Sequence, residues 1–316
     1  MEQNPGGRAP VFIMGPGRSG TSILYRSLQA HPVFRPENAE GGSSLTESKA
    51  FLRCPFSSDL AADHAVREFM LFDDDAYSSF LRSVPLWREL HAMSLRLRTP
   101  TLVERSDLLR IARFRLFGSH RVLASYFEHA RRARGCQRLI EKTPAHVRHL
   151  PELRATFPHA PLLIVLRHPI DIFASYRRRL AREREAGATS LRWLKLGAAK
   201  FARNFARDGR RILRTIRKDD HAKLVRYEQF TADTAAVLKQ IMAFLGEPYD
   251  EACLLSDHSD HVTWKADPRL FGPIATPETD WEAHITHEEA LEVETALGRL
   301  LPELGYAPRT APGGIL

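Results

Sequence analysis

The feature that most constrains the fold is a short apolar run near the N-terminus that leads into a glycine-rich turn. Residues 11–14 read Val-Phe-Ile-Met, a β-branched and aromatic run typical of a buried strand. The turn Gly15–Ser22 follows, and Ile23, Leu24 and Leu28 then lie on one face of a predicted helix that ends near residue 31. A strand, a glycine-rich turn and a helix aim free backbone N–H groups and the positive helix end at an anion. The sequence therefore predicts an anion-binding loop.

Later segments repeat the alternation of strand and helix. Arg138–Ile140 is a weak strand signal, Leu162–Leu166 a strong one and Lys223–Arg226 a third, with helical patterns between them. Continuously apolar strands that alternate with helices indicate a parallel sheet covered on both faces. We therefore expect one α/β domain over residues 1–316, in which flanking helices cover a central parallel sheet. A mostly helical insertion is expected at about residues 60–135.

Length and composition exclude several classes of protein. A chain of 316 residues can bury a core without disulfides. Its cysteines, Cys54, Cys136 and Cys253, are far apart and form no CxxC pair, so we expect neither a disulfide scaffold nor a metal site. No apolar run reaches the roughly 20 residues of a membrane span, and residues 1–10 lack a signal-peptide pattern. These features predict a cytoplasmic protein and leave its oligomeric state open.

The positive charge is concentrated in the middle of the chain. The net charge is +8, and Arg167–Arg226 alone contains 18 basic and 6 acidic side chains. Such a basic region predicts a polyanionic ligand, and a nucleotide, an acidic substrate and a nucleic acid all fit it. A nucleic-acid-binding module would show a steep salt dependence of binding and no preference for a 3′-phosphorylated adenosine. The aromatic residues of this region have spacings that suit a helix core better than base stacking.

The glycine-rich turn differs from the loop of nucleoside triphosphatases. Gly15 and Gly20 have the spacing of G-x-x-x-x-G-K-[ST], but Thr21 stands where the lysine belongs, and the cation is Arg18 instead. A loop without that lysine is poorly equipped for Mg-ATP, which weakens the alternative of a P-loop nucleotide kinase. It suits a phosphate-like group bound without metal. The candidate ligands are Arg18, the N–H groups of residues 19–22, and the hydroxyls of Thr21 and Ser22.

A second phosphate-binding pattern follows the strongest strand. Residues 167–175 read Arg-His-Pro-Ile-Asp-Ile-Phe-Ala-Ser. Arg167 ends the strand, Pro169 suits the first helical turn, and Ser175 lies two turns into the helix. An arginine fork and a hydroxyl placed in this way can converge on one phosphate.

In this order, the two motifs resemble those of the sulfotransferases that use 3′-phosphoadenylyl sulfate (PAPS). The segment containing Arg18, Ser19, Gly20, Thr21 and Ser22 resembles the family's 5′-phosphosulfate loop, and residues 167–175 resemble its R-x-P-x-D-x-x-x-S motif for the 3′-phosphate. The resemblance implies an enzyme that moves a sulfuryl group from PAPS to a hydroxyl or amine, without a metal. The product would be 3′,5′-adenosine bisphosphate (PAP), and the acceptor a small molecule, lipid or carbohydrate.

The resemblance extends to three further segments. Lys142, in Glu141–Pro144, stands where the family keeps an active-site lysine, and Tyr227 stands where a tyrosine lies near the adenine. Residues 264–269 resemble a C-terminal segment that closes over the 3′-phosphate, with Lys265 and Arg269 as its candidate cations.

The acceptor needs a general base, because a protonated hydroxyl attacks poorly. In the cytosolic small-molecule sulfotransferases the base is a histidine shortly after the active-site Lys-Thr pair, which corresponds to Lys142-Thr143. Here Pro144 stands at that position, and His146 lies two residues further on. Glycan and tyrosine sulfotransferases more often use a glutamate beyond the first helix, where this chain has Glu37, Glu40 and Glu47. We favour Glu40 and Glu47 as candidates. Acceptor specificity is expected in the loop and insertion at about residues 36–135.

Overall fold

The fold is built on a sheet of four parallel strands. The structure is a computed structural model, and it describes residues 8–37, 51, 124, 127–128, 130–132, 134–187, 194–254, 274 and 280–310. The strands are β1 (Val11–Met14), β2 (Ile140–Lys142), β3 (Leu162–Leu166) and β4 (Ala222–Arg226). Their order is β2-β1-β3-β4. The parallel pairing confirms the α/β architecture expected from the sequence.

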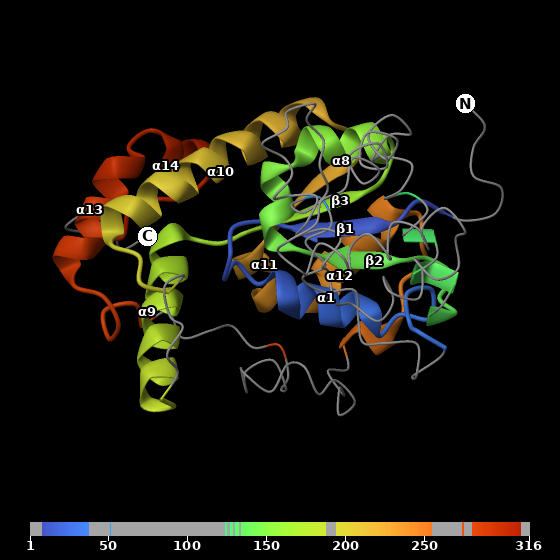
Figure 1. The fold of residues 1–316 in the computed structure, drawn as a ribbon, viewed down its shortest axis with the longest axis horizontal. Helices are drawn as coiled ribbons and strands as arrows, with labels where there is room; N and C mark the ends of the chain where they lie inside the picture. Colours follow the sequence, from blue (N-terminus) through green and yellow to red (C-terminus); the bar gives the residue numbers. More distant parts are fainter. Residues whose placement is uncertain are drawn as a thin grey trace, which may run out of the picture.

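Helices follow the strands as the alternating pattern predicts (Figure 1). Their bounds are α1 (Thr21–Gln29), α8 (Leu150–Thr156), α9 (Pro169–Glu185), α10 (Ala198–Lys218), α11 (Tyr227–Ala232), α12 (Thr234–Leu245), α13 (His287–Leu297) and α14 (Leu300–Glu303), with 3-10 turns at Pro144–Arg148 and Glu251–Leu254. Helix α13 begins at His287, with a capping box between Thr286 and Glu289.

Side chains of each central strand alternate between two apolar clusters, one on each face of the sheet. Val11 and Ile13 of β1 pack with α1, α11 and α12 on one face. Phe12 and Met14 pack with α8, α9, α10 and the C-terminal helices on the other. Figure 1 shows α1 and α12 on one side of the sheet and α10 with α8 on the opposite side. Because both faces are covered, the two central strands, β1 and β3, are apolar at every position.

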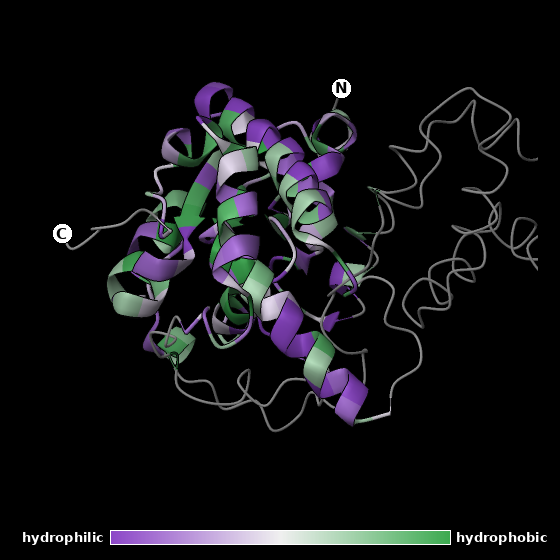
Figure 2. Cartoon of the chain, turned by 90° about the vertical axis from the view of Figure 1, so that its left-hand side faces the viewer, coloured by the Kyte–Doolittle hydropathy of each residue, from purple (hydrophilic) through white to green (hydrophobic). Residues whose placement is uncertain are grey.

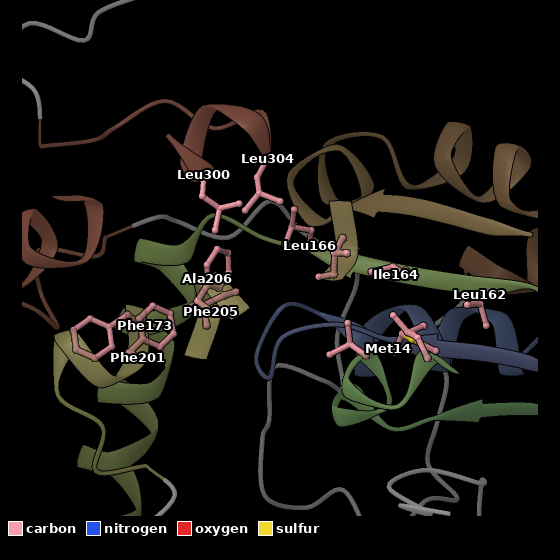
Figure 3. Packing of buried hydrophobic residues seen from close by; sticks show 14 of the residues in the cluster. Met14, Leu162, Ile164, Leu166, Phe173, Phe201, Phe205, Ala206, Leu300 and Leu304 are labelled. Atoms are coloured by element: carbon pink, nitrogen blue, oxygen red, sulfur yellow. The ribbon is translucent and has the colours of Figure 1, made fainter. Parts of the chain in front are cut away.

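Helix α9 leads away from the carboxyl edge of the sheet and packs on α10 and α13. Figure 3 shows Phe173 of α9 beside Phe201 of α10, with ring centroids 5.0 Å apart. Leu300 and Leu304 lie near Leu166, at the end of β3, in the same view and in the same cluster. In Figure 2 the helices carry hydrophilic and hydrophobic segments in alternation, as expected of helices with one buried face.

Two sequence predictions need comment. The weak strand predicted at residues 138–140 is found at 140–142, because Glu141 and Lys142, polar residues that follow the predicted strand, are buried in the sheet. Of the predicted insertion at 60–135, residues 60–123 lie outside the described part. Residues 124, 127–128, 130–132 and 134 are helical. None of the helices in the described ranges is long and apolar enough to cross a membrane.

Candidate active site

The glycine-rich loop, the Lys142 segment and the Arg167 motif lie at the carboxyl edge of the sheet. Since the four strands are parallel, the segments that follow them emerge at one edge, where ligands of open α/β sheets bind. The Gly15 N–H donates to the Pro144 carbonyl at 3.2 Å, which ties the glycine-rich loop to the segment after β2. The structure therefore brings together the loop after β1, the Lys142 segment and the Arg167 motif.

The glycine-rich loop has a backbone conformation that its sequence permits. Gly20 is the N-cap of α1 with φ of 99°, a left-handed value that other residues adopt only under strain, and Arg18 also has a positive φ of 68°. Thr21 and Ser22 are the first residues of α1, and N–H groups at this position have no partner within the helix. The Ser19 hydroxyl is buried and has no hydrogen-bond partner among the described residues.

Tyr227 joins this loop to the Arg167 motif. A Cβ atom on Gly20 would lie 2.2 Å from the Tyr227 ring, so the ring packs directly on the glycine. The guanidinium carbon of Arg167 lies 4.5 Å from the centroid of the same ring, a cation–π contact. The Nε atom of Arg167 is buried with no hydrogen-bond partner among the described residues. One aromatic ring thus positions the end of β3 against the start of α1.

Two contacts connect the loop to α9. The Arg18 Nε–H donates to the Ser175 hydroxyl at 3.1 Å. A Cβ atom on Gly17 would lie 2.4 Å from the Tyr176 hydroxyl oxygen, so that position accommodates only glycine without a shift. Sequence reasoning assigned Arg18 to the 5′ side and Ser175 to the 3′ side of a donor, and the structure places these two side chains in direct contact.

Lys142 is enclosed at the end of β2. It is 1% exposed and lies beside Ile13 in the parallel register, on the face of the sheet that α1 covers. Its neighbour Glu141 faces the opposite side, where its Oε1 atom accepts a 2.5 Å hydrogen bond from the Thr143 hydroxyl. The acidic side chain of Glu141 and the basic side chain of Lys142 therefore lie on opposite faces of the sheet.

His146 is fully buried among the described residues. Its Nδ1 atom lies 3.0 Å from the Glu141 Oε2 atom, and the rings of Phe12 and Phe51 lie 6.5 and 5.0 Å from its own. His146 sits in a 3-10 turn, with its side chain against the core. Its pairing with Glu141 had no signal in the local sequence.

Of the other candidate bases and cations, the structure describes only Glu37. Glu37 is exposed, and its N–H donates to the Arg134 carbonyl at 3.0 Å, near the start of β2. That position is at the amino edge of the sheet. Helix α1, which is about 13 Å long, runs from the glycine-rich loop toward this edge. Glu40, Glu47, Lys265 and Arg269 lie outside the described residues.

Sequence reasoning did not predict the hydrogen bonds that hold His168, the residue after Arg167, in place. The His168 N–H donates to the Glu228 Oε1 atom at 2.8 Å, and the Tyr306 hydroxyl donates to Oε2 of the same carboxylate at 3.2 Å. The His168 Nε2 atom lies 3.0 Å from the Ala307 carbonyl, while Nδ1 accepts from the Ile170 N–H. Burial, together with a nearby arginine, lowers the pKa of His168, so the ring is neutral with its proton on Nε2. Glu228 follows Tyr227 in a segment that the resemblance includes, but no local pattern predicts its contact with His168, and residues 306–307 have no local pattern at all.

The polar groups at this edge could contact a ligand at two separate places. One end offers the buried Ser19 hydroxyl and the first N–H groups of α1, and the other offers the unpartnered Nε atom of Arg167. Buried polar atoms in proteins are almost always hydrogen-bonded, so two such atoms at one edge indicate a polar ligand. Arg18, in the glycine-rich loop, and Ser175, on α9, are hydrogen-bonded to each other.

The family model described as "Sulfotransferase family" matches residues 10–251. The match covers most of the chain and includes the glycine-rich loop, Lys142 and the Arg167 motif, so the chain belongs to the sulfotransferase family. It is a transferase, and family and fold together imply sulfuryl transfer. The comparison with curated protein sequences finds no match.

Solved sulfotransferases share the fold at low sequence identity. The sulfotransferase domain from the curacin biosynthetic pathway is 17% identical, with a TM-score of 0.54 over 97% of this chain and 99% of that one. Sulfotransferase STF9 from Mycobacterium avium is 16% identical, with a TM-score of 0.51 over 96% of this chain and 78% of that one. These likenesses confirm the predicted fold and extend beyond the segment that the family model matches.

Proposed function

We propose that this sulfotransferase takes PAPS as its donor and transfers the sulfuryl group to a hydroxyl or amine of a small-molecule, lipid or carbohydrate acceptor. The observation that carries the proposal is the joining of two phosphate-binding motifs by Tyr227 and by the Arg18–Ser175 hydrogen bond. PAPS differs from ATP in its 3′-phosphate, and an arginine at a strand end beside a helix hydroxyl is suited to that group.

Each motif has a separate task in this proposal. The N–H groups at the start of α1, with Ser19, Thr21 and Ser22, hold the 5′-phosphate, which gains negative charge as its bond to sulfur breaks. Arg167 binds the 3′-phosphate. The contact of Arg18 with Ser175 supports a place for Arg18 between the two phosphates, where it attracts both. Tyr227 positions Arg167 and borders the adenine.

Lys142 and a general base complete the proposed chemistry. Lys142 supplies positive charge to the transferring group, and its enclosure strengthens that interaction because water does not screen it. The base accepts the acceptor's proton as the new oxygen–sulfur or nitrogen–sulfur bond forms. Glu37 lies at the opposite edge of the sheet, and His146 is paired with Glu141 on the face of the sheet opposite to Lys142. We keep Glu40 and Glu47 as the proposed bases, on the resemblance to the glycan and tyrosine sulfotransferases.

The test is thermal unfolding in the presence of PAP, ADP or Mg-ATP, each with and without EDTA. A ligand at one hundred times its dissociation constant adds about 2.7 kcal/mol to the free energy of unfolding. We expect PAP to raise the melting temperature by a few degrees, with no effect of EDTA and a much smaller shift for ADP. Arg167→Ala should abolish the PAP shift.

The matched control is Arg203→Ala, which removes the same charge from an exposed position on α10. It should bind PAP as the wild type does. A shift with Mg-ATP alone would replace the proposal by a nucleotide kinase. Binding that falls steeply with salt and ignores the 3′-phosphate would favour a nucleic-acid-binding module. Consumption of PAPS in the presence of acceptor candidates would then identify the acceptor class.

A further inference from the structure

The carboxylate of Asp171 has two arginines beside it, and only one of them holds it. Asp171 lies in the first turn of α9, four residues after Arg167. Here the Arg167 Nε atom is 3.8 Å from Asp171 Oδ2, beyond hydrogen-bond range. Arg309 donates instead to both oxygens: its Nη2 atom lies 2.9 Å from Oδ2, and its Nη1 atom bonds Oδ1. The Arg309 guanidinium therefore makes a bidentate ion pair with the carboxylate that would otherwise attract Arg167.

Arg309 reaches Asp171 because Glu294 holds its backbone. Glu294, on α13, is 6% exposed, and its Oε1 atom accepts the Arg309 N–H at 2.7 Å. Its Oε2 atom accepts both the N–H and the hydroxyl of Thr310, at 3.1 and 2.5 Å. One buried carboxylate thus fixes two consecutive residues of the C-terminal segment.

Residues 304–307 of the C-terminal segment make further contacts with the ends of β3 and β4. Arg226, at the end of β4, donates to the Leu304 carbonyl at 2.8 Å, and its guanidinium lies 5.2 Å from the centroid of the Tyr306 ring. The Tyr306–Glu228 and His168–Ala307 contacts described above lie between these two attachments. Residues 304–310 therefore pack against the segment that contains Arg167, although the two segments are more than a hundred residues apart in sequence.

From this geometry we propose that Arg309 is a positioning residue for donor binding, which neutralises Asp171 and so leaves the guanidinium of Arg167 available to the 3′-phosphate. The inference rests on the proposed PAPS function. Asp171 is 3% exposed, and a buried carboxylate that loses its partner is strongly destabilising. Without Arg309, the nearest described cation is Arg167, which would turn toward Asp171 and away from the ligand. Arg309 thus acts through Arg167 and needs no contact with the donor.

The test is a double-mutant cycle on PAP affinity, measured by calorimetry. Arg309→Ala should weaken PAP binding by about 10-fold to 100-fold, the usual range for losing a charge-assisted hydrogen bond. Asp171→Asn alone should stay within about threefold of the wild type. The double variant Arg309→Ala/Asp171→Asn should recover affinity to within about threefold of the wild type, because no acid then competes for Arg167.

A specificity measurement separates positioning from general support of the fold. The ratio of PAP affinity to 5′-AMP affinity should fall in Arg309→Ala and recover in the double variant, since only the 3′-phosphate contact is affected. Arg299→Ala, an exposed change ten residues earlier, is the control and should leave this ratio unchanged. If Arg309→Ala does not fold, Arg309→Gln removes the charge while keeping a donor for Asp171, and the same cycle applies.

Two results would overturn the inference. A double variant as weak as Arg309→Ala would mean that Arg309 supports the fold or touches the ligand itself. An Arg309→Ala protein that binds PAP as tightly as the wild type would mean that Arg167 does not respond to Asp171. Wild-type protein that does not bind PAP would instead refute the proposed function, so the two failures are distinguishable.

Discussion

Replacing Gly17 by alanine would place a methyl group against the hydroxyl of Tyr176. The built Cβ position lies 2.4 Å from that oxygen, a distance that Cβ atoms essentially never show, and the next atom of the ring is 3.6 Å away. The ring cannot retreat freely, because Tyr176 packs on Phe201, with centroids 6.2 Å apart, and on the Leu180–Leu194 pair. The added methyl group therefore has one specific obstacle, which is the hydroxyl oxygen.

The expected cost is that of overpacking a filled space, about 1–3 kcal/mol. With an unfolding entropy of about 2.1 cal/mol/K per residue over 316 residues, this lowers the melting temperature by about 2–5 °C. In a Tyr176→Phe background the nearest atom is the ring carbon at 3.6 Å, an ordinary van der Waals distance. The same alanine should then cost less than about 0.5 kcal/mol.

The assay is the melting temperature of the wild type, both single variants and the double variant, with and without PAP. The cycle removes whatever Tyr176→Phe costs by itself and isolates the coupling between the two positions. We expect a coupling of about 1–3 kcal/mol and a PAP shift that is reduced in Gly17→Ala and recovered in the double variant. Gly17→Ala that is equally destabilising in both backgrounds would refute the steric reasoning.

Three further predictions concern groups away from the loop. Glu247→Ala removes the partner of Arg138, a pair whose side chains are 1% and 6% exposed, and should lower the free energy of unfolding by about 3–5 kcal/mol in a denaturant titration. Its PAP affinity should not change, because the pair lies at the amino edge of the sheet, and a weakened affinity would contradict this placement. Burial raises the pKa of Cys253 to about 12, so about one thiol in ten thousand is ionised at pH 8, and iodoacetamide labelling located by peptide mass mapping should leave it unmodified. Because burial lowers the pKa of His168, its stabilising effect is complete above about pH 6.5 and is lost as the pH falls toward the lower folded value. Thermal unfolding between pH 7.5 and 5 should therefore show a shallower decline for His168→Gln, and an unchanged slope would exclude this residue as a contributor.

Much of the fold could be predicted because its signals are local. The run Leu162–Leu166 is apolar at every position, and it forms β3, the strand that pairs with both β1 and β4. The glycine-rich turn is recognisable because residue types and spacing alone determine which backbone conformations the loop can adopt. Strand β2 was misplaced by two residues because Glu141 and Lys142 are buried by their tertiary environment, which no hydropathy pattern records.

By itself the sequence predicted the α/β class and the sulfotransferase family, which the structure and the family match confirmed, and it located the glycine-rich loop and the Arg167 motif. All of these depend on short stretches of chain. Only the tertiary structure decided that Arg18 bonds Ser175, that Tyr227 lies between Gly20 and Arg167, and that Arg309 holds Asp171. These contacts join residues up to about two hundred positions apart. They arise because parallel strands bring their carboxyl ends to one edge, where side-chain partners are chosen by proximity in space and not by spacing in sequence.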